Sequence, residues 1–215
     1  MAAARDDFDL TALRAELAAY GALVTARRIR LGDEAAFADP RPEARVERRR
    51  ASGAARIAAR ALLDELGADG SAPLPRSPSG APLWPAGIVG SLAHDEAFAL
   101  AAAARRGRLV GLGVDVEPAE ALPEEVIDMV LSGAERRATA GDGVAQRLVF
   151  VAKEAVYKAI NPLDGSWLDF ADIEVGLAEG TATLRDGRRL RIIPFAGERL
   201  VAVALMEAAG VDPPS

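Results

Sequence analysis

The sequence predicts an α+β fold of two similar halves, because a helical segment followed by a group of strands occurs twice along its 215 residues. Hydrophobic residues make up 50% of the chain, which is enough to bury a core of that size. The two halves should meet near residues 107–113. We therefore expect an N-terminal unit of residues 1–110 and a C-terminal unit of residues 111–215, with a ligand crevice between them.

The first half is expected to begin with helices. Residues 11–20 are short and amphipathic, and residues 32–42 resemble a loop. A long helix should follow, with Pro42 in its first turn and Gly67 at its end, because apolar residues recur between them at helical spacing. A loop rich in Gly, Pro and Ser then leads to three strands separated by polar turns. These strands are predicted at residues 87–92, 97–104 and 109–117.

The second half repeats this order. Ser132 and Glu135 have the spacing of a capping box, which marks the start of a helix. Residues 146–160 should form a second long helix that Pro162 ends. Four strands with glycine-containing turns between them follow, at residues 173–177, 181–185, 190–195 and 200–206.

Composition excludes several classes of site. The chain has no cysteine and one histidine, His94, so a disulfide framework, a thiolate zinc site and a histidine cluster are ruled out, and any metal must be bound by oxygen atoms. A net charge of −6 argues against broad nucleic-acid affinity. We expect a cytoplasmic protein without a membrane span, because no signal-peptide pattern or long apolar run is present.

Lysine is almost absent from this chain. Only two of its 26 basic residues are lysines, Lys153 and Lys158, and both lie in the segment KEAVYK. An arginine-rich chain that keeps two lysines beside Glu154 suggests that an ammonium group is needed there. The alternative is a solvated Glu-Lys pair four residues apart on a helix.

A second motif, GVDVE, places two carboxylates on one face of a predicted strand. Alternation directs Asp115 and Glu117 one way and the valines the other. Such a pair favours a cation beside it, and Mg²⁺ prefers hard oxygen ligands. The alternative is an edge strand with its polar face in water. Together with Glu154, the pair offers three oxygen ligands, and Lys158 lies one helical turn beyond Glu154. This set of residues indicates phosphoryl-type transfer.

The segments GVDVE and FVAKEAVYKAINP, at their spacing here, resemble the 4'-phosphopantetheinyl transferases, in particular the bacterial group of the enterobactin synthase component D type, which serves siderophore and other non-ribosomal peptide assembly lines. Three further segments carry the resemblance, which covers roughly residues 44–175. They are Trp84-Pro85 with Gly90-Ser91-Leu92-Ala93-His94, the arginine-rich helix around residues 48–56, and Leu168-Asp169-Phe170.

This resemblance implies a pseudo-twofold α+β monomer that moves phosphopantetheine from coenzyme A to a serine of an apo acyl or peptidyl carrier protein and releases 3',5'-ADP. It implies Mg²⁺ bound by Asp115, Glu117 and Glu154, with Asp115, Glu154 and Lys158 as catalytic residues. Glu154, or a water bound by the carboxylates, would be the general base, and Lys158 would stabilise or protonate the departing phosphate. The expected contacts to coenzyme A are Arg48, Arg56, Arg76, His94 and Lys153.

The chain departs from the family pattern at Ala93, at Val151 and at the pair Ala51-Ser52, and each change bears on the coenzyme A site or its packing. Two other interpretations stay open. A metal-dependent nuclease also combines acidic residues with a glutamate and a lysine, although that Glu and Lys commonly lie two apart on a strand. A non-catalytic module that binds coenzyme A or a carrier protein is the other.

Overall fold

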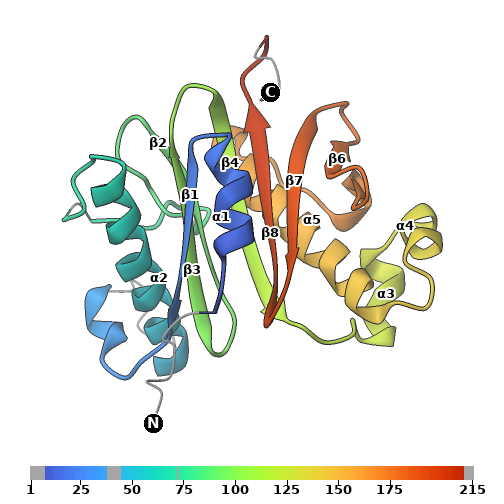
Figure 1. Ribbon diagram of the computed structural model, residues 1–215, viewed down its shortest axis with the longest axis horizontal. Helices are drawn as coiled ribbons and strands as arrows, with labels where there is room; N and C mark the ends of the chain where they lie inside the picture. Colours follow the sequence, from blue (N-terminus) through green and yellow to red (C-terminus); the bar gives the residue numbers. More distant parts are fainter. Residues whose placement is uncertain (1–7, 38–44, 72, 211–215) are drawn as a thin grey trace.

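Two antiparallel sheets lie next to each other in the computed structural model, which describes residues 8–37, 45–71 and 73–210 (Figure 1). The small sheet has the strand order β1-β3-β2, and the large sheet has the order β4-β8-β7-β6-β5. Each sheet carries a long helix across one face, α2 on the small sheet and α5 on the large one. The predicted α+β class is therefore confirmed, and both halves follow one plan.

The helices and strands have the following bounds. The helices are α1 (Thr11–Ala18), α2 (Val46–Glu65), α3 (Glu124–Val130), α4 (Gly133–Ala138) and α5 (Gly143–Asp164), with 3-10 turns η1 (Asp33–Ala36) and η2 (Phe170–Asp172). The strands are β1 (Ala22–Arg28), β2 (Ile88–His94), β3 (Phe98–Arg105), β4 (Leu109–Pro118), β5 (Ile173–Gly176), β6 (Thr181–Leu184), β7 (Arg189–Ala196) and β8 (Arg199–Glu207).

Most predicted elements are present, with two corrections. Strand β1 was missed, and it pairs with β3 along its whole length, from Ala22 opposite Ala104 to Arg28 opposite Phe98. The prediction that Pro162 ends the second long helix was wrong, because α5 continues to Asp164 and ends at Gly165, which has a φ of 72°. Proline removes one backbone donor, yet the last turn still closes through a 2.9 Å hydrogen bond from Gly165 N to Asn161 O. Pro42 lies outside the described residues.

A single core joins the two halves. Buried side chains of α1, such as Leu13 and Leu17, pack with Leu100 of the small sheet and with Val114 and Val203 of the large sheet. The opposite faces of the sheets are covered separately, by α2 on the small sheet and by α5 on the large one. The division into residues 1–110 and 111–215 stays a proposal, because strand β4 begins at Leu109 and the core crosses that boundary.

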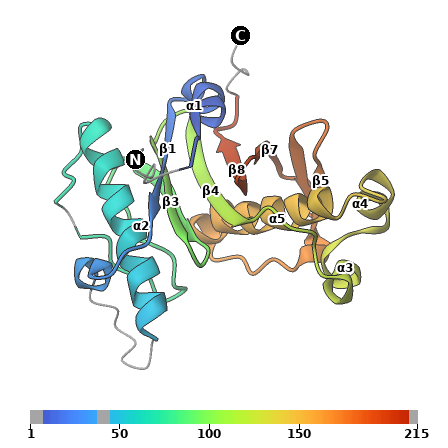
Figure 2. The ribbon, with the colours of Figure 1, turned by 60° about the horizontal axis from the view of Figure 1, so that its bottom comes forward.

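Helix α5 lies unusually close to strand β4, and the sequence of β4 explains why. A Cβ atom added at Gly113 would lie 1.9 Å from the carbonyl oxygen of Ala155, and one at Gly111 would lie 2.8 Å from that of Ala159. The glycines therefore allow the helix backbone to rest directly on the strand. This contact brings the KEAVYK segment beside the GVDVE strand, and β4 passes between α2 and α5 (Figure 2).

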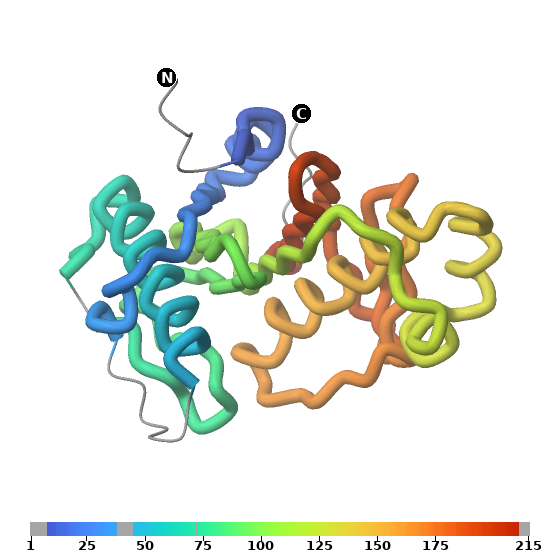
Figure 3. Tube along the Cα trace, turned by 90° about the horizontal axis from the view of Figure 1, so that it is seen from below, coloured from blue at the N-terminus to red at the C-terminus, as the bar shows by residue number. Residues whose placement is uncertain are grey.

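The C-terminal end of α5 is directed toward α2, so the two long helices approach each other on one side of the molecule (Figure 3). No helix within the described ranges is long and apolar enough to cross a membrane.

The close contact at Gly113 predicts that Gly113→Ala lowers the free energy of unfolding by about 1–3 kcal/mol or prevents folding, because the new methyl group overlaps a helix carbonyl. Urea unfolding monitored by circular dichroism would measure the loss. Gly107→Ala is the matched control, since an added Cβ there meets no atom within 4 Å, and its unfolding should change little. Equal stabilities for the two variants would contradict the proposed close packing.

Candidate active site

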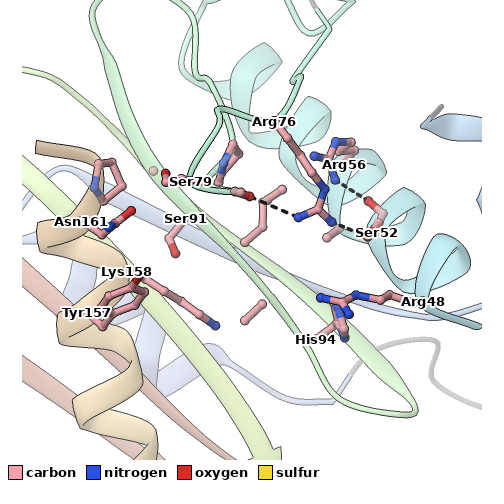
Figure 4. Close-up of a pocket in the computed structure, with 18 residues that line it drawn as sticks. Arg48, Ser52, Arg56, Arg76, Ser79, Ser91, His94, Tyr157, Lys158 and Asn161 are labelled. Carbon is pink, nitrogen blue, oxygen red and sulfur yellow. Dashed lines mark hydrogen bonds between the residues drawn. The ribbon is translucent and has the colours of Figure 1, made fainter. Parts of the chain in front are cut away.

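A cavity of about 450 Å³ opens between the two halves, a volume within the usual range for small-molecule sites (Figure 4). It collects three arginines and a histidine from the N-terminal half and polar side chains from α5. The lining includes Arg48, Ser52 and Arg56 of α2, Arg76 of the following loop, His94 at the end of β2, and Tyr157, Lys158 and Asn161 of α5. Five residues predicted to act in the site, Arg48, Arg56, Arg76, His94 and Lys158, therefore share one cavity.

Arg56 and Arg76 are held in place by hydrogen bonds to backbone carbonyl groups, and Arg76 also donates to the hydroxyl of Ser52. The buried Arg56 donates from Nε to Leu74 O at 2.8 Å and from Nη1 to Ser52 O at 3.0 Å, and its guanidinium lies 3.4 Å from the ring centre of Phe37. Arg76 donates from Nη2 to Ser52 Oγ at 2.9 Å and from Nη1 to Gly80 O at 3.1 Å. Ser52, noted as a departure from the family pattern, thus orders both guanidinium groups.

His94 lies at the rim of the cavity, where β2 ends, and the exposed side chain of Arg48 points toward it from α2 (Figure 4). The pKa of His94 is below its ordinary value. His94 is exposed by surface area, yet the protein atoms around its imidazole still disfavour the charged form, and the positive charges of Lys158 and Arg48 add to the effect. His94 is therefore expected to be neutral at pH 7.

Lys158 connects the cavity to the carboxylates of β4. Its Nζ donates to Asp115 Oδ1 at 2.5 Å, and the Asp115 side chain is almost fully buried. Burial raises the pKa of Asp115, and the ammonium of Lys158 opposes that rise. The ion pair forms because α5 packs against β4, and this contact places Lys158 beside the strand.

Glu117 and Glu154 are both within the electrostatic field of Asp115. Burial raises the pKa of each, and the negative charge of Asp115 raises it further. Arg147 offsets part of this rise at Glu117, where its Nη1 donates to Oε2 at 3.1 Å. Asp115 thus lies close enough to both glutamates to repel each of them.

The expected metal site is not assembled as a finished cluster. Within the described ranges, no three Asp, Glu, His or Cys side chains are arranged so that they could hold a metal ion as they stand. Lys158 and Arg147 instead contact Asp115 and Glu117. The donor set nevertheless suits Mg²⁺, because it consists of carboxylate oxygens whose mutual repulsion a cation would relieve.

The structure contradicts the phosphate contact predicted for Lys153. This side chain is fully buried on the far side of α5, and it does not line the cavity. Its Nζ lies 2.7 Å from Glu135 Oε2 and donates to Val130 O at 2.8 Å and to Phe170 O at 3.0 Å. A buried ammonium with three oxygen partners is a structural group, because it has no donor left for a ligand.

Sequence reasoning missed three residues that shape the site, and it noted a fourth, Ser52, only as a departure from the family pattern. Tyr157 and Asn161 line the cavity, and helical spacing could have identified Asn161, because it lies three residues after Lys158 on the same face. Ser52 and Phe37 position the arginines. No local pattern predicted these contacts, because they depend on the packing of η1 and the loop near residue 76 against α2.

Profiles of two related families match this chain. The N-terminal domain of 4'-phosphopantetheinyl transferases matches residues 34–104, and the 4'-phosphopantetheinyl transferase superfamily matches residues 111–203. These two ranges contain every cavity residue named above.

Curated relatives agree with these matches. The 4'-phosphopantetheinyl transferase Svp of Streptomyces mobaraensis is 42% identical over 173 residues, which cover 72% of this chain and 70% of the relative. The 4'-phosphopantetheinyl transferase Npt of Nocardia iowensis is 41% identical over 146 residues, covering 66% of this chain and 65% of the relative. Enterobactin synthase component D of Escherichia coli O157:H7 is a weaker match, 34% identical over 96 residues, covering 41% and 45%.

The chain therefore belongs to the 4'-phosphopantetheinyl transferase family. The enzyme class predicted from the GVDVE and KEAVYK segments is confirmed.

The charges around His94 predict that its pKa rises when Arg48 is replaced by alanine, because one of the cations that disfavour the imidazolium is removed. His94 is the chain's single histidine, so an NMR titration of its imidazole resonances is free of overlap. Arg60→Ala, on the same helix, is the control and should leave the titration unchanged. A pKa of His94 that is the same in the Arg48→Ala variant and the parent would contradict this arrangement.

Proposed function

We propose that this protein transfers 4'-phosphopantetheine from coenzyme A to a serine hydroxyl of an apo acyl or peptidyl carrier protein, with Mg²⁺, and releases 3',5'-ADP. One observation carries the proposal. A cavity lined by cations of the N-terminal half leads to Lys158, which is bonded to Asp115 near two further carboxylates. One chain supplies all of these groups, which supports a monomer. We also propose that the enzyme is cytoplasmic.

The cationic side of the cavity suits the phosphates of coenzyme A. Arg56 and Arg76 are already oriented by the contacts described above, and Arg48 and His94 lie at the rim. Guanidinium groups bind phosphate oxygens with paired hydrogen bonds, and groups that are ordered beforehand lose little freedom when the ligand arrives. We assign these four residues to the 3'-phosphate and diphosphate.

The reaction then needs a base beside the phosphorus atom. The serine oxygen forms a new bond to the phosphorus of the phosphopantetheine group, and the bond from that phosphorus to the bridging oxygen of the diphosphate breaks. The bridging oxygen leaves with 3',5'-ADP and its electron pair. We assign the serine proton to Glu154 or to a water bound by the carboxylates, since the raised pKa of Glu154 suits proton acceptance.

Lys158 and Asp115 complete the proposed site. Lys158 lines the cavity, and we assign its ammonium to the departing phosphate, where it stabilises developing negative charge or supplies a proton. Asp115 orients this ammonium through their 2.5 Å contact. Mg²⁺ bound by Asp115, Glu117 and Glu154 would neutralise charge on the diphosphate.

The decisive test of the function is the intact mass of an apo carrier protein after incubation with this protein, coenzyme A and Mg²⁺. We expect a gain of one phosphopantetheine group that EDTA abolishes and that Glu154→Gln reduces strongly. Arg185→Ala, an exposed substitution at a residue that does not line the cavity, should leave the gain intact. No gain with several carriers, despite folded protein that binds coenzyme A, would favour a non-catalytic binding module.

A second prediction separates binding from chemistry. Replacing Lys158 by alanine should lower kcat roughly 10²- to 10³-fold, because a charge aimed at the departing phosphate is lost. Affinity for coenzyme A should persist, since Arg48, Arg56 and Arg76 are unchanged. Single-turnover kinetics and calorimetric titration with coenzyme A would measure the two effects. Loss of binding with kcat retained would make Lys158 a ligand anchor.

A further inference from the structure

An ion pair between Asp95 and Arg199 joins the two halves of the molecule beside the site. Arg199 Nε donates to Asp95 Oδ2 at 2.5 Å. The Asp95 side chain is 2% exposed and that of Arg199 is 16% exposed, so water screens this pair only weakly. Asp95 belongs to the small-sheet half and Arg199 is the first residue of β8 in the large sheet.

Both partners are fixed by further contacts. Asp95 Oδ1 accepts from Ala97 N at 2.7 Å and from Phe98 N at 2.6 Å, which sets the turn between β2 and β3. The Arg199 guanidinium lies 5.0 Å from the ring centre of Phe98, and its Nη1 donates to Glu198 O at 3.1 Å. The pair is therefore a rigid contact between two hairpins and not a mobile surface ion pair.

The position of the pair in the fold connects it to the site. His94, at the cavity rim, directly precedes Asp95. In the large sheet, Arg199 is opposite Pro118 and Leu200 is opposite Glu117. The contact thus lies one residue from His94 on one side and one register step from Glu117 on the other.

We propose that Asp95 and Arg199 are positioning residues that keep the phosphate-binding edge at His94 in register with the carboxylate strand at Glu117. The inference rests on the proposed function, in which the N-terminal half binds the phosphates and the C-terminal half carries the chemistry. Neither residue lines the cavity. Asp95 acts through His94, which precedes it in the chain, and Arg199 acts through Glu117 on the paired strand.

A small displacement of one half relative to the other has a large effect on a site whose residues come from both halves. The phosphate-binding cations of one half and the carboxylates of the other must be placed correctly around the same diphosphate. Misplacement by about 1 Å can lower the rate of a positioned reaction roughly a hundredfold. Removal of Arg199 also leaves a buried carboxylate at Asp95 with backbone donors alone, which favours opening of the contact.

The test compares Arg199→Ala with a matched ion pair at the other end of the same strands. Arg108 precedes β4 and lies 2.7 Å from Glu207 at the end of β8, with both side chains about a quarter exposed. We expect Arg199→Ala to reduce kcat/KM for coenzyme A roughly tenfold or more. Arg108→Ala should reduce thermal stability and leave kcat/KM unchanged. Arg199→Lys should recover part of the loss, because it restores a cation beside Asp95.

A double-mutant cycle on coenzyme A affinity distinguishes positioning from plain stability. His94→Ala should weaken binding in the parent and in the Arg108→Ala background by the same factor. In the Arg199→Ala background it should add little, because His94 is already displaced.

Full additivity of His94→Ala with Arg199→Ala, in folded protein, overturns the inference. So does an Arg199→Ala variant that loses stability but keeps its kcat/KM. A parent protein that neither binds coenzyme A nor modifies a carrier would instead remove the proposed function. If Arg199→Ala does not fold, Asp95→Asn takes its place in the same comparison, and Arg199→Lys remains the partial rescue.

Discussion

The site depends on the direct contact of α5 with β4 at Gly111 and Gly113. Without side chains at these two positions, the helix backbone approaches the strand closely enough for Lys158 to reach Asp115. A larger residue would separate the two elements and with them the ammonium and the carboxylates. The glycines therefore determine the spacing of the charged groups, although they carry no functional group themselves.

The two halves contribute charges of opposite sign to the site. Cations converge from α2 and the loop after it, and carboxylates lie on β4 and α5. In this structure the carboxylates are partly neutralised by Lys158 and Arg147, while Arg56 and Arg76 bind backbone and hydroxyl oxygens. The hydrogen-bond donors of Arg56, Arg76 and Lys158 are thus oriented by other groups of the protein before a ligand binds.

Local sequence patterns identified most of the helices and strands and the charged residues of the site. They failed where the structure depends on contacts between residues far apart in the sequence. The capping box of Ser132 and Glu135 is formed as predicted. Strand β1 was missed because its register is set by β3, far along the chain. Lys153 was placed in the site because it is next to Glu154, yet its direction is set by Glu135, which lies 18 positions earlier. Sequence adjacency on a helix therefore identified the region, and packing determined which face was functional.

The burial of Lys153 has a consequence for covalent chemistry at this protein. The chain has two lysine side chains, and one of them is enclosed with all three of its donors used. Lys158 is thus the single lysine that an acylating or alkylating reagent can approach, and it is 29% exposed at the cavity. A reagent bound in the cavity would meet one lysine amine, which donates a hydrogen bond to Asp115. Covalent labelling of lysine in this protein would therefore report on the cavity alone.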